Sequence, residues 1–210
     1  MSIIRRVAGL AIVVLLAASL LPAQKPASKS AEELRPQCLG NPNAAVSIEV
    51  FSDHQCPACR QLYLETMRSV LADYGMPGKV CLTYYEFPLR AHKYSRDAAR
   101  YSQAASRLGP MQWIQVADAL YYYQPQWSES GEIEPVVAKA LSEKDMSQVR
   151  QWLKDPKLEA AIERDLNEGT RRAVRSTPTI FVTANGSTER FTGVLQYPIF
   201  RRYLDNLLTR

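Results

Sequence analysis

The chain has 210 residues, a formal net charge of +5 at pH 7 and a pI near 9.0. This length fits one large domain, or a smaller domain that carries an insertion, and it can bury a core without depending on disulfides. Lys and Arg residues are spread along the chain instead of clustered, and no RNA- or DNA-binding motif is present. We therefore expect a solvated surface and no nucleic-acid partner.

The N-terminal end has the layout of a secretory signal peptide. Arg5 and Arg6 precede the uncharged apolar run 7–21, which is shorter than the roughly 20 residues that a membrane-spanning helix needs. We predict a signal peptide at residues 1–23, cleaved at the end of that range or after Ser19, with an uncleaved membrane anchor as the alternative. The expected location is the periplasm or another extracytoplasmic compartment, where cysteines meet oxidising conditions.

The next part of the chain predicts a β-α-β unit. Residues 24–36 are polar and interrupted by prolines, which is typical of a linker, and 36–39 form a candidate edge strand. The apolar run 46–51 predicts a strand, the spacing of apolar residues over 57–74 predicts a helix, and 79–87 predicts a second strand. Two strands joined by a helix in this way are expected to pair in parallel.

The remaining residues predict a helical block, followed by a helix, a β-hairpin and a last helix. Asn185-Gly186 is typical of a two-residue hairpin turn. Asp155 and Pro156 are typical of an N-cap and of the first position of a helix. The predicted helices are 94–108, 111–123, 133–141, 147–153, 156–174 and 198–208, with a loop at 125–131 and hairpin strands at 179–184 and 188–194. This order of elements predicts an α/β fold.

Cys56 and Cys59 stand where the first strand passes into the helix. A thiol-exchange centre needs one cysteine that ionises near neutral pH and a second that resolves the mixed disulfide. The helix N-terminus favours a thiolate at Cys56, and Pro57 fits the first helical turn because its missing N–H costs nothing there. Cys59 lies on the same helical face and further inward, which suits a resolving thiol. We therefore predict a redox-active dithiol.

Two alternatives remain for this cysteine pair, a zinc half-site and a pair of structural cysteines. Zinc prefers four ligands, and the other candidates are Cys38, Cys81, His54 and His92, without a second close pair. Export, the preceding strand and the following helix favour the redox interpretation, in which the protein needs no metal and no cofactor.

Thr177-Pro178 precedes the first hairpin strand. An X-Pro bond is the one peptide bond that adopts the cis form at modest cost. A cis-proline turn here would place the Thr177 backbone beside the dithiol, open to strand-like pairing with an extended peptide. The alternative is an ordinary proline at the start of a strand.

Cys38 and Cys81 are the second cysteine pair. Cys81 lies inside the second predicted strand and Cys38 in the predicted edge strand. If these strands are neighbours, a structural disulfide is geometrically reasonable. Two buried free thiols are the alternative.

Four segments of the chain carry a family resemblance when they are taken together. They are Asp53-His54-Gln55-Cys56-Pro57-Ala58-Cys59, Tyr85-Glu86-Phe87-Pro88-Leu89 followed by His92, Gln124-Pro125-Gln126-Trp127, and Thr177-Pro178-Thr179. In combination they resemble the DsbA-like thiol–disulfide oxidoreductases of the thioredoxin-fold superfamily, over about residues 37–208. The resemblance implies a thioredoxin-like domain formed by 37–90 and 156–210, with a helical insertion at 91–155.

The resemblance also implies roles for individual residues. Cys56 corresponds to the nucleophile, Cys59 to the resolving cysteine and Thr177-Pro178 to the cis-proline loop that contacts the substrate. The usual activity of the family is the donation of disulfides to exported polypeptides that contain cysteines. A quinone-linked membrane partner is expected to reoxidise the dithiol.

The chain departs from the family pattern at three places. Between the cysteines stands Pro57-Ala58, where relatives often carry His or Tyr. Val50 occupies a position where relatives often carry a buried glutamate, and Glu49 would face the other side of the strand, so Cys59 lacks an obvious proton carrier. His54 replaces a common aromatic residue. A protonated His54 could stabilise the thiolate, but we favour a surface histidine, and His54, Pro57 and Ala58 remain candidate modulators.

The sequence thus predicts an exported thiol–disulfide oxidoreductase that acts through Cys56-Pro57-Ala58-Cys59 as a disulfide donor. A reductase or isomerase of the same fold is the first alternative. The alternative from a different class is a non-catalytic exported chaperone or metal-binding module.

Overall fold

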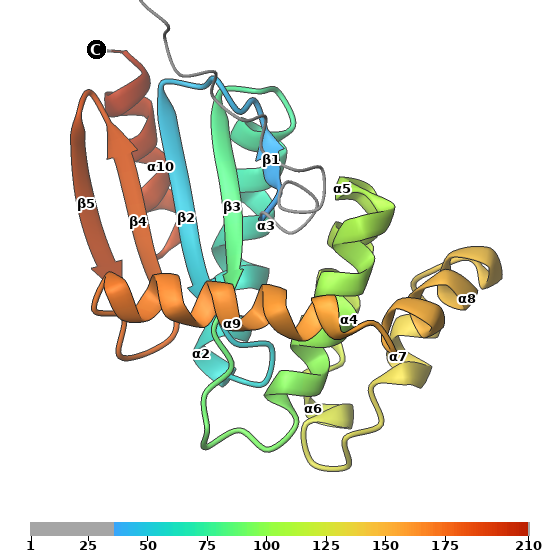
Figure 1. Cartoon of the computed structure of the whole chain (residues 1–210). Helices are drawn as coiled ribbons and strands as arrows, with labels where there is room; N and C mark the ends of the chain where they lie inside the picture. Colours follow the sequence, from blue (N-terminus) through green and yellow to red (C-terminus); the bar gives the residue numbers. More distant parts are fainter. Residues whose placement is uncertain (1–35, 210) are drawn as a thin grey trace, which may run out of the picture.

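The computed structural model describes residues 36–209 and contains a five-stranded mixed sheet (Figure 1). The strand order is β1-β3-β2-β4-β5. β2 and β3 pair in parallel, as predicted for a β-α-β unit, and the other neighbours pair antiparallel. The strands are β1 (Cys38–Gly40), β2 (Val46–Ser52), β3 (Val80–Glu86), β4 (Thr179–Ala184) and β5 (Ser187–Thr192). The predicted α/β class and thioredoxin-like fold are confirmed.

Helices cover both faces of the sheet. One continuous helical run follows β2 and packs with the last helix, α10 (Tyr197–Leu208), on one face, whereas α9 (Pro156–Arg171) crosses the other face (Figure 1). The run after β2 consists of α2 (Pro57–Leu62), η1 (Tyr63–Met67), α3 (Arg68–Val70) and η2 (Leu71–Gly75), of which η1 and η2 are π-helical.

The alternation of side chains along β3 shows why this strand lies in the interior. Val80, Leu82 and Tyr84 are buried, and the residues between them are half-buried. The inward residues meet apolar side chains of the α2–η2 run and of α10, which together form the main core. Because side chains on a strand alternate between faces, the buried side of β3 continues to its last residue, Glu86.

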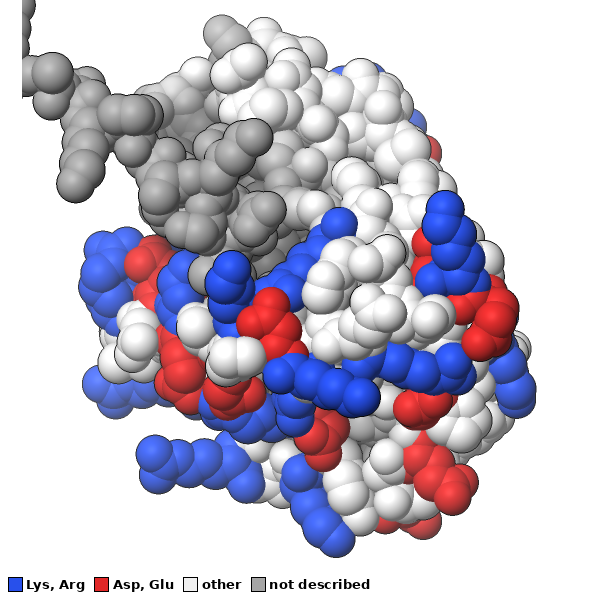
Figure 2. All heavy atoms as spheres, turned by 45° about the vertical axis from the view of Figure 1, so that its right-hand side comes forward, with Lys and Arg blue, Asp and Glu red and all other residues white. Residues whose placement is uncertain are grey.

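The helical block between β3 and α9 has its own core. Its helices are α4 (Ser95–Leu108), α5 (Pro110–Tyr122), α6 (Gln124–Trp127), α7 (Glu134–Ala138) and α8 (Glu143–Trp152). Trp127, Leu120 and Met146 are among its fully buried side chains. On the face that Figure 2 shows, Lys and Arg side chains lie among Asp and Glu side chains. Arg150, for example, pairs with Glu134 at 2.8 Å and with Glu143 at 3.0 Å.

Two predictions in this block were wrong. The segment predicted as a loop at 125–131 begins inside the one-turn helix α6, because Pro125 is tolerated in a first helical turn and Trp127 is buried there. The helix predicted from residue 147 starts at Glu143, because Ser142 is its N-cap and accepts a hydrogen bond from the Asp145 N–H. The other helices end within a few residues of the predicted bounds, and the helix predicted to reach residue 174 ends at Arg171.

α9 approaches the sheet closely at Gly169. A Cβ atom at this position would lie 2.4 Å from the Phe87 ring and 3.1 Å from that of Phe51. Phe51 and Phe87 form a small apolar cluster with Phe181 and Val174 on this face of the sheet. The absence of a side chain at Gly169 therefore allows the helix to cover the ends of β2 and β3, next to the start of α2.

The predicted signal peptide at 1–23 and most of the predicted linker at 24–36 lie outside the described residues. Within residues 36–209, the structure has no helix of the length and apolarity that crossing a membrane requires.

Candidate active site

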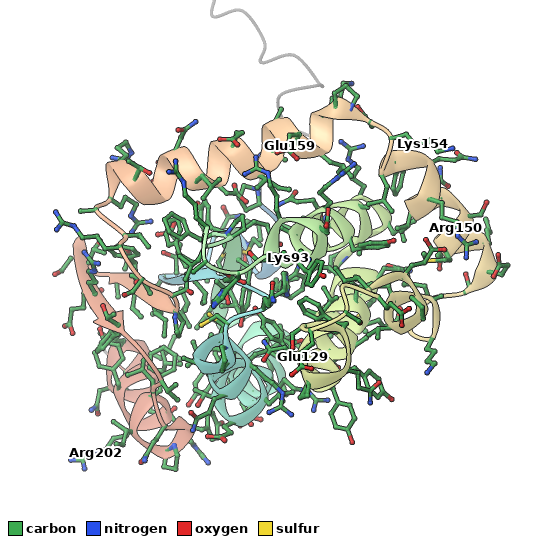
Figure 3. All side chains as sticks on the ribbon, turned by 90° about the horizontal axis from the view of Figure 1, so that it is seen from below. Lys93, Glu129, Arg150, Lys154, Glu159 and Arg202 are labelled. Carbon is green, nitrogen blue, oxygen red and sulfur yellow. A yellow bond between two sulfur atoms is a disulfide. The ribbon has the colours of Figure 1, made fainter. Side chains whose placement is uncertain are left out.

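The two cysteines of the Cys56-Pro57-Ala58-Cys59 segment lie at the start of α2, where β2 ends. Cys56 is the N-cap residue, with an extended backbone conformation, and Pro57 occupies the first turn. Both cysteines are free thiols, Cys56 being 6% exposed and Cys59 1% exposed. The end of the molecule that carries them is seen from below in Figure 3, where Lys93 and Glu129 are labelled on the same side. Of the two sulfur-bearing residues, Cys56 is therefore the less deeply buried.

The surroundings of Cys56 favour its thiolate. Hydrogen bonding by the Cys59 side chain, the largest influence, lowers the pKa of Cys56 from 9.0 to about 5, against the opposing effect of burial. Smaller contributions come from the Thr177 side chain and from the backbone of Cys59 and Ala58. The backbone groups belong to the first turn of α2, whose N–H groups have no partner within the helix. Most of Cys56 is therefore ionised at neutral pH.

The surroundings of Cys59 have the opposite effect. Burial raises the pKa of Cys59 well above its usual value of 9.0, and the hydrogen bond and the charge of Cys56 raise it further. The Ser52 side chain, which hydrogen-bonds Cys59, opposes this shift. The Asp53 N–H also points at the Cys59 sulfur, at 3.5 Å. Cys59 is thus a protonated thiol wherever the pair is reduced at neutral pH.

The Thr177-Pro178 peptide bond is cis and lies beside Cys56. The Thr177 carbonyl oxygen is 3.5 Å from Sγ of Cys56. β2 and β4 run antiparallel with Phe51 opposite Thr179, so the end of β2 and the start of β4 meet at one edge of the sheet. The structure therefore brings Thr177 and Pro178 to the dithiol, 121 residues away in sequence from Cys56.

Asp53 and Gln55 fasten the loop that precedes Cys56. Asp53 Oδ2 accepts hydrogen bonds from the Leu89 N–H at 2.8 Å and from His92 Nδ1 at 2.7 Å. Gln55 Oε1 accepts from the Tyr94 N–H at 2.7 Å. These contacts attach the loop between β3 and α4 to the start of α2, so His92 helps to position the cysteine loop and does not face the sulfurs directly.

His54 is buried, so the surface position that we favoured from the sequence is wrong. It is 2% exposed, and its Nε2 atom lies 3.2 Å from Glu86 Oε2. Its ring also packs on Tyr121, with ring centroids 4.9 Å apart. The burial arises because Glu86 ends β3 on the inward face and offers a partner that a short-range sequence pattern does not reveal. Among residues 36–209, no hydrogen bond or ion pair joins the His54 side chain to Cys56.

Three further residues of the site have no predicted role. Gln124 is buried and its Nε2 group donates to the carbonyl oxygens of His54 at 2.7 Å and Cys56 at 3.1 Å. Glu86 could have been found by continuing the two-residue alternation along β3. The Tyr121 hydroxyl forms a hydrogen bond of 2.8 Å with Ser52 Oγ. Tyr121 is far from the dithiol in sequence, and no motif points to this contact.

The second cysteine pair forms a disulfide between Cys38 and Cys81, with Cα atoms 5.3 Å apart. It joins β1 to the beginning of β3, whereas Glu86 and the dithiol lie at the other end of that strand. Its position indicates a structural link in the sheet.

A family model described as Thioredoxin matches residues 33–205. The predicted DsbA-like, thioredoxin-fold class is supported by this match together with the relatives described below. Because the match covers most of the chain, the protein belongs to this thioredoxin family.

Individual relatives agree with this assignment. "Probable disulfide bond formation protein D" of Bacillus anthracis is 25% identical over 153 residues, which cover 71% of this chain and 70% of the relative. The crystal structure of alpha-DsbA1 from Wolbachia pipientis has a TM-score of 0.69 at 17% identity, covering 83% of this chain and 92% of that chain. Oxidised BdbD from Bacillus subtilis has a TM-score of 0.60 at 18% identity, covering 83% and 94%. The two solved structures establish the likeness of the fold.

Proposed function

We propose that Cys56 exchanges disulfides with exported polypeptides that contain cysteines, and that Cys59 is the resolving thiol. The observation that carries this proposal is the opposite shift of the two thiols, with the pKa of Cys56 at about 5 and that of Cys59 well above 9.0. A thiolate is the reactive form in exchange, and a sulfur of low pKa is also a good leaving group. One ionised sulfur beside a protonated sulfur that is buried more deeply suits attack by a client followed by internal resolution.

The proposed direction is disulfide donation. An ionised Cys56 stabilises the dithiol form of the protein, so its disulfide form is more readily reduced by a client. In the donor reaction a client thiolate attacks Sγ of Cys56, the Cys56–Cys59 bond breaks, and Cys59 takes a proton. A second client thiolate then attacks the client sulfur of the mixed disulfide and releases Cys56 as a thiolate. A membrane partner linked to quinones would return the pair to the disulfide.

Thr177 and Pro178 are proposed to position the client. The Thr177 carbonyl oxygen lies 3.5 Å from Sγ of Cys56. A peptide in extended conformation could pair with this backbone in the manner of an added strand. The division into a thioredoxin-like domain at 37–90 and 156–210 and a helical insertion at 91–155 belongs to the same proposal, as does export through residues 1–23.

Two variants test the reaction. Cys56→Ser is expected to abolish exchange with a reduced dithiol peptide, because the attacked sulfur is gone, while peptide binding persists. Cys59→Ser is expected to accumulate mixed disulfides between Cys56 and clients, because resolution is blocked, and mass spectrometry under non-reducing conditions would detect them. Full biological activity in Cys56→Ser would favour the chaperone or metal-binding alternative. A reductase or isomerase would instead show a Cys56–Cys59 couple that is more reducing than the glutathione pool.

A further inference from the structure

Asp53 is a buried carboxylate beside the dithiol to which the reaction described above assigns no role. Its side chain is 0% exposed, and burial of such a group is costly unless hydrogen bonds compensate. Three donors do so: the Gln55 N–H at 2.8 Å on Oδ1, and the Leu89 N–H at 2.8 Å and His92 Nδ1 at 2.7 Å on Oδ2. Two of them belong to the loop between β3 and α4, so the carboxylate is held from outside the cysteine loop.

The main-chain groups of Asp53 meet both cysteines. The Asp53 carbonyl oxygen accepts a hydrogen bond from the Cys56 N–H at 3.1 Å, and the Asp53 N–H points at Sγ of Cys59, at 3.5 Å. The Ser52 hydroxyl is a second hydrogen-bonding group beside the Cys59 sulfur, and it also bonds to the Tyr121 hydroxyl. The direction of the Asp53 N–H therefore affects any charge that forms on Cys59.

The peptide group between Ser52 and Asp53 is also held on its carbonyl side. The Ser52 carbonyl oxygen accepts a hydrogen bond from the Phe87 N–H at 2.8 Å. Because a peptide group is planar, the bond to its oxygen helps to fix the direction of its N–H, and two hydrogen bonds in line strengthen each other. The segment 87–92, which contains Phe87, Leu89 and His92, thus holds both this peptide group and the Asp53 side chain.

We propose that Asp53 is a positioning residue for the opening of the disulfide: its carboxylate, held by segment 87–92, keeps its own N–H aimed at Sγ of Cys59. The inference rests on the proposed function, because only a reaction that breaks the Cys56–Cys59 bond places negative charge on that sulfur. Among residues 36–209, no hydrogen bond joins the Asp53 carboxylate to either sulfur, so the side chain acts through the main chain. A hydrogen bond to an ionised acceptor is stronger than one to a neutral acceptor, so the N–H stabilises the leaving thiolate more than the disulfide.

The bond changes balance in the donor direction. A client thiolate forms a bond to Sγ of Cys56, the Cys56–Cys59 bond breaks, and its electron pair passes to Sγ of Cys59. The Asp53 N–H donates a hydrogen bond to this new thiolate and keeps its proton. A proton from solvent then neutralises Cys59. Asp53 is therefore neither an acid nor a base in the reaction.

Three variants test the support of this N–H. Asp53→Asn keeps one acceptor oxygen of two, so the amide cannot satisfy the same three donors. His92→Ala removes one donor and leaves Asp53 itself unchanged, whereas His92→Asn can place a side-chain N–H group where Nδ1 lay. The His92 side chain is 24% exposed, so its replacement disturbs the core less than that of Asp53.

Asp155→Asn is the matched control. The Asp155 carboxylate also accepts from a main-chain N–H, that of Lys157 at 2.9 Å, and from a basic side chain, that of Arg107 at 2.9 Å. These contacts lie at the start of α9, and none of them involves the cysteine loop. The control therefore removes the same chemical group from a comparable set of donors.

Two rates are measured for each protein at neutral pH. The oxidised protein is mixed with excess reduced glutathione and quenched with acid at intervals, and the loss of the Cys56–Cys59 disulfide is followed by alkylation and mass spectrometry. The reduced protein is treated with iodoacetamide, which alkylates Cys56 without breaking a bond to Cys59. A general loosening of the loop would change both rates, whereas loss of support for the leaving sulfur changes the first alone.

We expect disulfide opening to slow about tenfold in Asp53→Asn and about threefold in His92→Ala, and to recover in His92→Asn. The alkylation rate of Cys56 should stay close to that of the wild type, because the hydrogen bonds of the Cys59 side chain and of the first turn of α2 are kept. Asp155→Asn should keep both wild-type rates. If Asp53→Asn does not fold, the two His92 variants decide.

Three results would overturn the inference: a wild-type rate of disulfide opening in Asp53→Asn or His92→Ala, equal slowing of opening and of Cys56 alkylation, or equal slowing in the Asp155→Asn control. Opening as slow in His92→Asn as in His92→Ala would likewise refute a role for the hydrogen bond to Asp53. Failure of the proposed function would look different. In that case the wild-type protein would form no mixed disulfide between Cys56 and glutathione, and the inference would fall with it.

Discussion

Cys56 and Cys59 are three residues apart on one helical turn, yet their thiols differ strongly in acidity. The difference arises from how deeply each sulfur is buried and from which hydrogen bonds it receives. Cys56 caps the helix and receives hydrogen bonds from Cys59 and from the first turn, whereas Cys59 points into the core beneath it. Because the ionised Cys56 has a folded-state pKa below the usual 9.0, it stabilises the reduced protein increasingly as pH rises from about 5 toward 9.0, and this stabilisation is lost below pH 5.

A prediction for the reduction potential follows from these two thiols. Below pH 5 both sulfurs gain a proton on reduction, and above it only Cys59 does, so the number of protons per two electrons changes from two to one at the Cys56 pKa of about 5. The potential of the pair should fall by about 59 mV per pH unit below this point and by about 30 mV per pH unit above it. Titration against glutathione at a series of pH values measures the slopes.

The variant Cys59→Ala tests the cause of the low Cys56 pKa. It removes the hydrogen bond that is the largest cause of the low Cys56 pKa, so the pKa should rise, and the alkylation rate at mildly acidic pH should fall. Cys59→Ser, which keeps a hydroxyl donor, should retain more of the effect. Equal Cys56 pKa values in Cys59→Ala and in the wild type would contradict the assignment of the cause.

The site residues that could be predicted are those whose role is indicated by residues adjacent in the sequence. Cys56 and Cys59 are recognised by the strand, the proline and the helix around them, and Thr177-Pro178 by the strand that follows. The contact between His54 and Glu86 could not be predicted in this way, because it joins residues 32 positions apart. Burial of His54 depends on the pairing of β2 with β3, which local patterns do not specify.

At the scale of elements, β1 is a strand of only three residues with few contacts to the sheet. It forms an outer strand of the sheet, paired with β3 alone, and Leu39 is its one buried side chain. The disulfide between Cys38 and Cys81 closes a separation of 43 residues that contains β2 and the whole α2–η2 run. A cross-link of this kind restricts the unfolded chain more than the folded one.

Removal of this disulfide should therefore destabilise the fold without changing the chemistry. In Cys38→Ala/Cys81→Ala we expect the free energy of unfolding to fall by about 2–4 kcal/mol, measured by urea denaturation. The Cys56 pKa should stay at about 5, because β1 and the dithiol lie at opposite ends of β3. An unchanged unfolding midpoint would show that β1 packing alone fixes the edge of the sheet.

The hairpin and α6 show why a sequence predicts the kind of secondary structure better than the residues at which it begins and ends. The hairpin at Asn185-Gly186 was predicted correctly, because a two-residue turn has its own backbone signal, with positive φ at both residues. The short helix α6 was missed, because four residues carry no periodicity. What stabilises α6 is the burial of Trp127, whose Nε1–H group donates to the Leu120 carbonyl at 2.8 Å.

At the scale of the whole molecule, the helical block and the sheet meet directly at the cysteine loop. Gln124 of α6 donates to two carbonyl groups of that loop, and Gln55 Nε2 donates back to the Ser128 carbonyl at 2.8 Å. Arg60 of α2 also donates to the Tyr121 carbonyl at 2.9 Å. The block is thus part of the support of the dithiol and not only an appendage of the sheet.

We therefore expect Gln124→Ala to lower the free energy of unfolding by about 1–3 kcal/mol, because it leaves the His54 carbonyl without its side-chain donor. The Cys56 carbonyl loses one of two donors and keeps the Arg60 N–H. The rate of Cys56 alkylation should change in the same variant, since the loop loses a support. Gln126→Ala is the matched control: Gln126 lies on the same short helix but is exposed. Equal effects of the two substitutions would refute a specific role for Gln124.

The contact between Tyr84 and Trp113 gives the molecule an optical property. Their rings lie 4.9 Å apart, and both residues belong to the buried core that contains Cys59. All three tryptophans of the chain, Trp113, Trp127 and Trp152, belong to the helical block, which contains no cysteine. A change of charge or bonding at the buried sulfur therefore occurs in the same core as an intrinsic fluorophore, Trp113. We therefore expect the emission of a tryptophan from the cysteine-free helical block to change when the dithiol is oxidised.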